Sequence, residues 1–347
     1  MELIIDKFLE NHKLSGAEYL TLLEGWENQE ISSRLAQEAV RIRDYYYGRK
    51  IFTRGLIEFT NYCKNNCYYC GIRNGNRNAG RYRLTEEEIL KCCHMGYEMG
   101  HRTFVLQGGE DPWFTDEKAA EIIRRIKGEF PDCAVTLSIG EKSFESYRLF
   151  REAGADRYLL RHETADETLY RSLHPAGMSL KRRKQCLYDL KELGYQVGAG
   201  FMVGAPGQTL AHLAKDLVFL QELQPQMAGI GPFIPHHDTK YGDEKAGSIE
   251  LTLFLLSVIR IMLPTVLLPA TTALGTLDPT GREKGFMAGA NVVMPNLSPM
   301  EKRRQYELYD NKIGTREEDG ESMESLARRA QCAGCRLVSE RGDAVKL

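Results

Sequence analysis

The feature that most constrains the fold of this chain is a regular alternation of short apolar runs with longer amphipathic segments. Several amphipathic segments carry helix start signals, such as Thr85 before three glutamates and Thr209 before the run to Leu223. Strands that alternate with helices form parallel sheets joined by right-handed crossovers. The apolar runs with strand character are 56–62, 102–107, 134–139, 157–161, 196–203, 227–234, 265–270 and 290–295.

Eight such units predict an α/β fold, a closed (β/α)8 TIM barrel rather than an open doubly wound sheet. Polar residues follow nearly every run, and the carboxyl ends of the strands build the functional site of such a barrel. We expect a helical N-terminal extension at 1–50, the barrel at 51–300, and a short C-terminal extension at 301–347.

Charge and cysteine usage narrow the class of protein. The 46 basic and 48 acidic residues are interspersed, which argues against nucleic-acid binding. The charged N-terminus does not resemble a signal peptide, and Arg260 and Pro264 interrupt the most apolar window, so no membrane span is expected. Nine cysteines without a secretory leader do not indicate a disulfide framework. We therefore expect a cytoplasmic protein whose cysteines are free to ligate metal.

Three cysteines lie on one short loop after the first apolar run, at positions 63, 67 and 70. Soft thiolate ligands suit iron–sulfur centres, and three of them on a 4Fe–4S cluster leave one iron open to a small molecule. Zinc and inert cysteines are the alternatives, but zinc usually requires a second cysteine pair nearby. The spacing, the aromatic Tyr69 and the place after the first strand favour an iron–sulfur cluster.

This loop resembles that of the radical S-adenosylmethionine (radical SAM) family, with Tyr69 at the family's aromatic position. The resemblance implies that the amino and carboxylate groups of SAM bind the open iron. One-electron reduction then cleaves SAM to methionine and a 5′-deoxyadenosyl radical. The sequence 108–110, Gly-Gly-Glu, is similar to the family's motif for the SAM amino group, although alone it would be read as a turn.

Two further side chains fit a SAM site. Glu163 follows the fourth run and is a natural acceptor for ribose hydroxyls, with an ion pair to Arg161 as its alternative role. The basic run 181–184 would ordinarily be a solvated helix face. Within it, Arg183 falls on the stripe that faces the barrel while Arg182 does not, so Arg183 is the better candidate for the SAM carboxylate.

The resemblance narrows to the HydE family, the radical SAM maturases of FeFe-hydrogenase in the biotin synthase-like group. The stretches 161–164, 202–209, 229–236, 269–273 and 290–296 carry it, and the match runs from about residue 35 to 313. It implies Cys63, Cys67 and Cys70 as cluster ligands. It places Tyr69, Gln107, Gly108, Gly109, Glu110, Glu163, Arg183 and Met202 around SAM, and Thr136, Ser138, Arg161, Thr271, Thr272, Met294, Tyr306 and Tyr309 around the substrate.

The resemblance also implies a reaction, which is assembly of the two-iron subcluster of the hydrogenase. The substrate would be a small iron–carbonyl–cyanide–cysteine complex made by HydG, and the product would pass to the HydF scaffold. Contacts with HydG and HydF would be transient, the electron would come from an external donor, and we expect a monomer. For Thr271 and Thr272, strand packing is the simpler alternative role, and for Met294 it is lining the barrel without touching substrate.

The chain departs from the family pattern near its C-terminus. Some members carry a second cluster, with one cysteine after a Lys-Ile pair and a C-x2-C pair downstream. Here Gly314, Ser322 and Ser325 occupy those positions, so we predict no second cluster. Cys332 and Cys335 form a C-x2-C pair of their own. It could be an adventitious metal site or a redox pair, but because it offers only two thiolates we favour no functional role.

Three other functions compete with the maturase. Methylornithine synthase would need acidic groups for a diamino substrate, whereas the Thr271–Thr272 end is neutral. Biotin synthase would need extra cysteines at the strand ends, and none is present there. A non-catalytic iron–sulfur carrier would have no use for the residues predicted to hold SAM.

Overall fold

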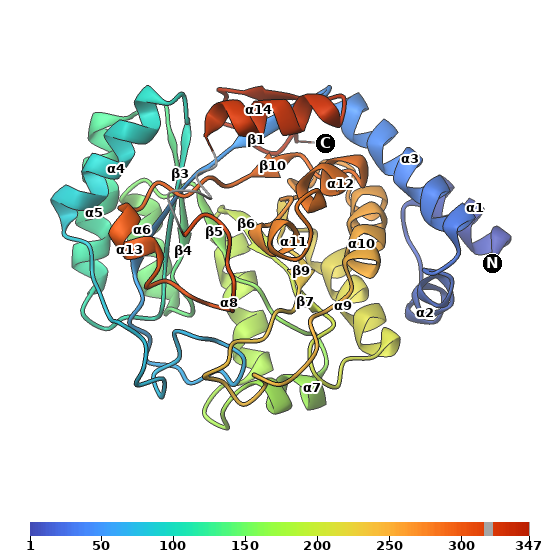
Figure 1. Ribbon diagram of the computed structural model, residues 1–347, viewed down its shortest axis with the longest axis horizontal. Helices are drawn as coiled ribbons and strands as arrows, with labels where there is room; N and C mark the ends of the chain where they lie inside the picture. The colour runs from blue at the N-terminus through green and yellow to red at the C-terminus, as the bar shows by residue number, and fades with distance from the viewer. Residues whose placement is uncertain (316–321, 347) are drawn as a thin grey trace.

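The computed structural model describes residues 1–315 and 322–346. In it, parallel strands and short extended segments form a ring, which is the wall of the barrel (Figure 1). Six neighbouring strands form one continuous sheet. In order they are β2 (Gly55–Thr60), β3 (Thr103–Gly108), β4 (Ala134–Ser138), β5 (Arg157–Leu159), β6 (Gln196–Ala199) and β8 (Met227–Ala228).

The ring closes through isolated parallel bridges, which join Met227 to Leu267, Pro269 to Val292 and Leu56 to Asn296. The predicted TIM barrel is therefore confirmed. The prediction of a regular strand at 265–270 is wrong, because this segment forms only isolated bridges. Proline has no amide hydrogen to donate to a ladder, so Pro269 limits pairing in this segment.

Two other predicted strands are each divided into short pieces. The run 196–203 contains β6 and then β7 (Met202–Val203), and the run 227–234 contains β8 and then β9 (Gly231–Pro232). Between β6 and β7, Gly200 has a φ of 153° and approaches Gly229 so closely that a Cβ would lie 2.0 Å from its carbonyl oxygen. The break moves β7 and β9 into a separate pair at the mouth of the barrel.

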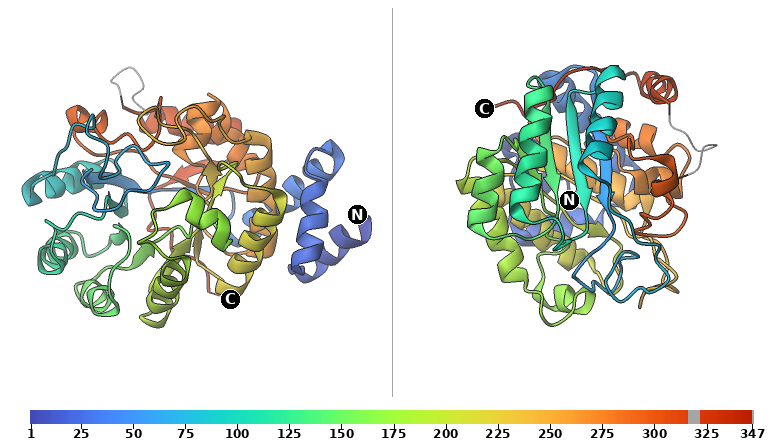
Figure 2. Two further views of the ribbon diagram at one scale, coloured as in Figure 1. Left: turned by 90° about the horizontal axis from the view of Figure 1, so that it is seen from below. Right: turned by 90° about the vertical axis from the view of Figure 1, so that its left-hand side faces the viewer.

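Helices cover the outside of the ring (Figure 2). Thr85 caps its helix with a capping box as predicted from the sequence. The helices of the barrel are α4 (Glu86–Glu98), α5 (Asp116–Glu129), α6 (Phe144–Glu152), α7 (Glu167–Leu173), α8 (Leu180–Glu192), α9 (Leu210–Leu223), α10 (Ile249–Met262), α11 (Thr272–Leu277) and α12 (Gly281–Met287).

The first 47 residues form three helices, α1 (Glu2–Asn11), α2 (Gly16–Glu24) and α3 (Gln29–Tyr47). Helix α2 packs on α9 and α3 packs on α10, so these helices lie against one side of the barrel (Figure 1). Among the described residues, no helix is long and apolar enough to cross a membrane.

The C-terminal residues form α13 (Met300–Arg303), α14 (Met323–Cys332) and β11 (Arg336–Val338). Strand β11 pairs in parallel with β1 (Lys50–Thr53), which also pairs with β10 (Val292–Val293). Neither β1 nor β11 was predicted from the sequence. Beyond β11, Asp343 forms an ion pair with the fully buried Arg157 at the amino end of β5, so the tail covers the bottom of the barrel.

Candidate active site

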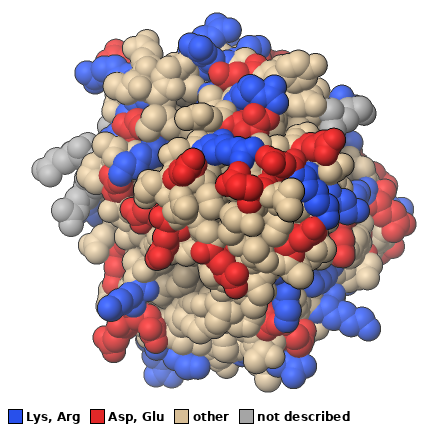
Figure 3. Space-filling view, turned by 90° about the vertical axis from the view of Figure 1, so that its right-hand side faces the viewer, with Lys and Arg blue, Asp and Glu red and all other residues tan. Residues whose placement is uncertain are grey.

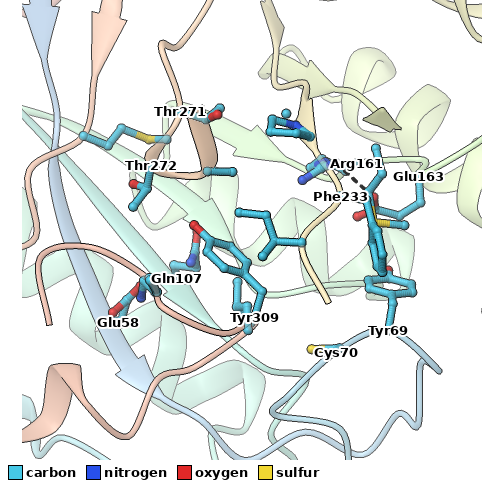
Figure 4. A pocket seen from close by; sticks show the side chains of 18 of the residues that line it. Glu58, Tyr69, Cys70, Gln107, Arg161, Glu163, Phe233, Thr271, Thr272 and Tyr309 are labelled. Atoms are coloured by element: carbon cyan, nitrogen blue, oxygen red, sulfur yellow. Dashed lines mark hydrogen bonds and ion pairs between the residues drawn. The ribbon is translucent and has the colours of Figure 1, made fainter. Parts of the chain in front are cut away.

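A cavity of about 310 Å³ opens at the carboxyl ends of the barrel strands (Figure 4). Its walls hold residues from strands β2, β3 and β9, from the cysteine loop, and from the C-terminal segment around Tyr309. The predicted residues that line it are Tyr69, Cys70, Gln107, Arg161, Glu163, Met202, Thr271, Thr272, Met294 and Tyr309. The cysteine loop therefore shares one cavity with both the predicted SAM residues and the predicted substrate residues.

The loop with Cys63, Cys67 and Cys70 follows β2 directly, and all three residues are partly exposed and free of disulfides. Gly109 supports this loop from the next strand end. A Cβ on Gly109 would lie 2.2 Å from the carbonyl oxygen of Tyr62 and 2.7 Å from the Cβ of Cys63, so only glycine allows this approach. The glycine motif thus packs directly against the cysteine loop.

Burial raises the pKa of each of the three thiols, and it raises that of Cys70 to about 12. The neighbouring sulfurs, Cys63 for Cys70 and both others for Cys67, raise these pKa values further. Thiolates in such a place need a compensating positive charge, which metal ions supply to their thiol ligands. The three cysteine sulfurs are soft donors that do not easily ionise without a metal. They are therefore suited to bind an iron–sulfur cluster at this loop.

Glu163 lies on the same side of the cavity as Tyr69 of the cysteine loop and forms an ion pair with Arg161 at 3.2 Å (Figure 4). Both roles considered for Glu163 are thus compatible with the structure, since it pairs with Arg161 and also lines the cavity. Its backbone has a φ of 67°, a conformation that costs a non-glycine residue about 1–3 kcal/mol and clusters at functional sites.

The segment that carries Glu163 is held from behind by a buried pair, His162 and Asp216. Their side chains are fully buried, the Nε2 and Oδ1 atoms lie 3.3 Å apart, and the amide of Ala165 donates a hydrogen bond to Asp216. Burial lowers the pKa of His162 and raises that of Asp216, so both groups favour their neutral forms. Neither residue was singled out for this role from the sequence.

Arg183 is buried, as predicted, on the stripe of α8 that also buries Leu180, Leu187 and Leu190, whereas Arg182 is exposed. The Arg183 Nε atom lies 2.8 Å from Oε1 of Glu141. Burial raises the pKa of Glu141, although the Arg183 charge opposes this. Arg183 is not among the residues that line the cavity, and Glu141 was not predicted as its partner.

The Gly108–Glu110 motif also lies outside the cavity lining. The Glu110 carboxylate accepts a hydrogen bond from the amide of Glu141 and pairs with Lys64 at 3.2 Å. It therefore links the ends of β3 and β4 to the cysteine loop.

The predicted substrate residues divide into two groups. Thr271, Thr272, Arg161, Met294 and Tyr309 line the cavity, and Thr136, Ser138 and Tyr306 do not. The hydroxyl oxygens of Thr271 and Thr136 are buried without a hydrogen-bond partner among the described residues.

Two charged residues of the cavity were missed from the sequence, Glu58 on β2 and Lys312 in the C-terminal segment. They form a buried ion pair, and Glu58 also accepts a hydrogen bond from Asn296 at 2.8 Å. The available sequence signal was weak, because Glu58 is the one charged residue within the apolar run 56–62.

Comparison with known proteins identifies the family. The model of the radical SAM superfamily matches residues 57–220. The FeFe hydrogenase maturase subunit HydE of Thermotoga maritima is 46% identical over 314 residues, which cover 86% of this chain and 89% of the relative. The chain belongs to the HydE family of radical SAM proteins.

Other known proteins are less similar to this chain in sequence. The 3-methylornithine synthase of Methanosarcina barkeri is 31% identical, over 95% of this chain and 92% of the relative. The crystal structure of methylornithine synthase (PylB) matches with a TM-score of 0.83 and 29% identity, covering 96% of this chain and 97% of that one. HydG from Carboxydothermus hydrogenoformans has a TM-score of 0.81, with 22% identity over 97% and 79% of the two chains, and shows the shared fold.

Family membership confirms several predictions made from the sequence. This member of the HydE family is a radical SAM enzyme of the hydrogenase-maturase type, and it has the TIM barrel of its relatives. A radical SAM enzyme uses a 4Fe–4S cluster and SAM, so the predicted cofactor class is confirmed. It also needs a small substrate and an external source of electrons.

Proposed function

We propose that this enzyme cleaves SAM at a cluster held by Cys63, Cys67 and Cys70 and uses the radical to assemble the two-iron subcluster of FeFe-hydrogenase. The observation that supports it best is one cavity, lined by Cys70 together with Glu163, Thr271 and Thr272. The substrate would be a small iron–carbonyl–cyanide–cysteine complex. The 46% identity to HydE supports the assignment of this chemistry to the pocket.

A cluster held by Cys63, Cys67 and Cys70 would supply the one electron needed for reductive cleavage of SAM to methionine and a 5′-deoxyadenosyl radical. The residues of this chain bind and orient SAM. Glu163 would accept hydrogen bonds from the ribose hydroxyls, and Arg183 would hold the SAM carboxylate with its planar guanidinium. Tyr69, Gln107, Gly108, Gly109, Glu110 and Met202 would complete the SAM site.

The substrate would lie between SAM and the Thr271–Thr272 end of the cavity. Cyanide and carboxylate groups accept hydrogen bonds, so donors such as Arg161 and the two threonine hydroxyls suit a compact anionic complex. The unpartnered hydroxyl of Thr271 is the strongest single support for this placement. Thr136, Ser138, Met294, Tyr306 and Tyr309 would surround the same ligand.

The remaining features of the proposal concern the rest of the chain. We divide it into the helical extension at 1–50, the barrel at 51–300 and the C-terminal extension at 301–347. We infer no second cluster, because Gly314, Ser322 and Ser325 stand where some members carry cysteines. We also propose a cytoplasmic monomer that contacts HydG and HydF transiently and does not bind nucleic acid or membranes.

The first test measures SAM cleavage under anaerobic conditions. The cluster is reconstituted, SAM and dithionite are added, and 5′-deoxyadenosine is quantified. We expect deoxyadenosine from the natural chain and none above background from Cys67→Ala. Equal yields from the two proteins would contradict the assigned ligands. No product from the natural chain would favour a non-catalytic carrier of iron and sulfur.

The second candidate function is 3-methylornithine synthesis, which the 31% identical relative favours. The cavity does contain two carboxylates, Glu58 and Glu163, but each forms an ion pair, with Lys312 and Arg161 respectively. Two assays separate the candidates. The maturase should restore hydrogenase activity in a strain that lacks only HydE, and the alternative enzyme should instead release 3-methylornithine from free amino acids.

A further inference from the structure

Two histidines and one aspartate meet beside the cysteine loop, outside the candidate active site. His236 and His237 lie in the loop between β9 and α10, and Asp310 lies in the C-terminal segment. Each offers one ligand atom, and the three atoms lie within 4.8 Å of one another. None of the three residues lines the cavity. The proposed function therefore makes no use of this cluster.

The ring of His236 is fixed in one orientation by the cysteine loop. Its side chain is 4% exposed, and a Cβ on Gly71 would lie 2.2 Å from its Cδ2 atom and 2.5 Å from its Nε2 atom. The opposite edge of the ring carries Nδ1, which lies 4.0 Å from Oδ1 of Asp310. The amide of Asp238 donates a hydrogen bond to Nδ1 at 3.1 Å, so this nitrogen is unprotonated. It therefore has the lone pair that a metal ligand needs.

The carboxylate of Asp310 is oriented by the backbone of the same loop. The amide of His237 donates a hydrogen bond to its Oδ2 atom at 3.0 Å, and the amide of Asp310 donates to the carbonyl of Pro235 at 3.0 Å. The Oδ1 atom faces the two imidazoles, at 2.8 Å from Nδ1 of His237 and 4.0 Å from Nδ1 of His236. Hydrogen bonds of this kind orient carboxylates that ligate metals.

The charges around this cluster favour a bound cation. On the face that the N-terminal helices cover, basic and acidic side chains are interleaved, so carboxylates there have cationic neighbours (Figure 3). The surroundings of Asp238 and Asp310 are different. Among the described residues, neither carboxylate forms an ion pair with a lysine or an arginine, and both pair with histidine instead.

The spacing of the ligand atoms suits zinc. Zinc takes four tetrahedral ligands, with nitrogen and oxygen atoms about 2.0–2.2 Å from the metal, so that neighbouring ligand atoms lie roughly 3.3–3.5 Å apart. The separations of 2.8 and 4.0 Å from Oδ1 of Asp310 lie on either side of that value. The side chain of His237 is 66% exposed, so it is free to adjust. Water would supply the fourth ligand.

We propose that His236, His237 and Asp310 bind one divalent zinc ion through the two Nδ1 atoms and the Oδ1 atom. At His236 the ion would replace the hydrogen bond from the amide of Asp238. At His237 the ring proton would lie on Nε2 instead of Nδ1. The Oδ2 atom of Asp238 lies 3.4 Å from that Nε2 and would accept its hydrogen bond, an arrangement typical of metal-bound histidines.

Zinc at this place would hold the C-terminal segment against the barrel. The segment reaches the cavity, because Leu308 and Tyr309 line its wall. The amide of Gly71 already donates a hydrogen bond to the carbonyl of Leu308 at 2.9 Å. The ion would add a second connection, from Asp310 to the loop after β9. Its role would be structural, since its ligands lie outside the cavity that holds the reacting groups.

The experiment measures zinc binding by the enzyme with its iron–sulfur cluster reconstituted. Zinc sulfate is titrated anaerobically in competition with a fluorescent chelator, and iron is measured before and after to show that zinc does not displace it. His237→Ala and Asp310→Asn are the test variants. His94→Ala is the matched control, because His94 is 58% exposed and lies 2.7 Å from the carboxylate of Glu129 without belonging to the cluster.

We expect the natural chain and His94→Ala to bind one zinc ion about tenfold or more tightly than His237→Ala and Asp310→Asn. The same ion should raise the midpoint of thermal unfolding of the natural chain more than that of His237→Ala, because a ligand of the folded state stabilises it. Zinc bound to any cysteine, including Cys332 and Cys335, would be equal in all four proteins and would not produce these differences.

Equal zinc affinity of the natural chain and His237→Ala would overturn the proposal, and so would an equal loss of affinity in His94→Ala. Neither measurement depends on SAM cleavage. A chain that forms no deoxyadenosine would contradict the proposed function and leave the zinc result unchanged.

Discussion

At the scale of single residues, the cavity contains polar groups that the protein itself does not satisfy. The buried hydroxyl of Thr271 has no hydrogen-bond partner among the described residues, whereas that of Thr60 donates to Asp111 at 2.7 Å. A buried hydroxyl without a partner costs roughly 1–3 kcal/mol. Its presence in the cavity is therefore best explained by a ligand that completes the bond.

Thr271→Val tests this explanation because valine keeps the shape and removes the hydroxyl. We expect the free energy of unfolding to stay equal or rise slightly, since no internal hydrogen bond is lost. Conversion of the substrate should fall about tenfold, the effect of one lost hydrogen bond of about 1.4 kcal/mol. Urea unfolding and product analysis check the two effects. A decrease of more than 1 kcal/mol in the free energy of unfolding would indicate instead that Thr271 serves to pack the strand end.

Glu163 offers a second test at this scale, because its φ of 67° favours glycine. Glu163→Gly and Glu163→Ala both remove the carboxylate and should both weaken SAM binding. The glycine variant should be more stable than the alanine variant by about 1 kcal/mol, since only alanine retains the backbone strain. Calorimetric titration with SAM and urea unfolding measure the two properties. Tight SAM binding by either variant would exclude Glu163 from the SAM site.

At the scale of elements, the residues after β5 depend on helix α9. Asp216 on α9 accepts a hydrogen bond from Ala165 and contacts His162, so it holds the segment that places Glu163 in the cavity. The strand-end residues that face the cavity are thus positioned by a helix on the outside of the barrel.

Asp216→Ala should lower the free energy of unfolding by about 2–3 kcal/mol, because it leaves the buried amide of Ala165 without its acceptor and opens a gap beside the His162 ring. SAM affinity should fall with it, since Glu163 loses its support. Glu222→Ala removes an exposed carboxylate from the same helix and serves as the control. Equal urea midpoints for the two variants would contradict the supporting role.

At the scale of the whole molecule, the C-terminal tail closes the bottom of the barrel. Arg157 is fully buried and pairs with Asp343 at 2.6 Å, and its guanidinium also donates to the carbonyl of Arg341 at 2.9 Å. The Arg157 charge, although opposed by burial of the group, helps hold the pKa of Asp343 well below its usual range. The last residues therefore stabilise the first half of the barrel.

Asp343→Asn should destabilise the fold by about 2–3 kcal/mol, somewhat less than the loss of a fully buried partner, because Asp343 is partly exposed. The exposed Asp243→Asn provides the control. Urea unfolding measures both, and a change below 0.5 kcal/mol in Asp343→Asn would show that the tail contributes little.

The pH dependence of stability also belongs to the whole molecule. Burial lowers the pKa of His101 and of His174 to about 4, so both stay neutral in the folded chain while the unfolded chain takes up protons below about pH 6.5. The contribution of each neutral histidine to the free energy of unfolding is therefore fully present above pH 6.5 and is lost as the pH falls towards 4. At pH 5 the loss is about 2 kcal/mol per histidine. Urea unfolding at pH 7 and pH 5 measures this loss. His101→Gln should reduce it, and an equal loss in that variant would assign it to other groups.

Local sequence patterns were sufficient to predict the fold and part of the candidate site. The spacing of Cys63, Cys67 and Cys70, the cap at Thr85 and the inward position of Arg183 each depend on residues a few positions apart. The alternation of apolar runs and helices determined the barrel, because parallel strands with right-handed crossovers leave few other arrangements. The stretches that resemble HydE correctly identified the family.

Only the tertiary structure decided which distant residues meet. Glu58 and Lys312 are 254 positions apart, and Arg157 and Asp343 are 186 apart, so no local period relates them. Their pairing follows from closure of the ring and from the path of the C-terminal segment over both ends of the barrel. Burial then makes each pair necessary, since a charge removed from water requires a partner. The sequence by itself determined the barrel and the cysteine loop, and the folded chain determined the walls of the cavity.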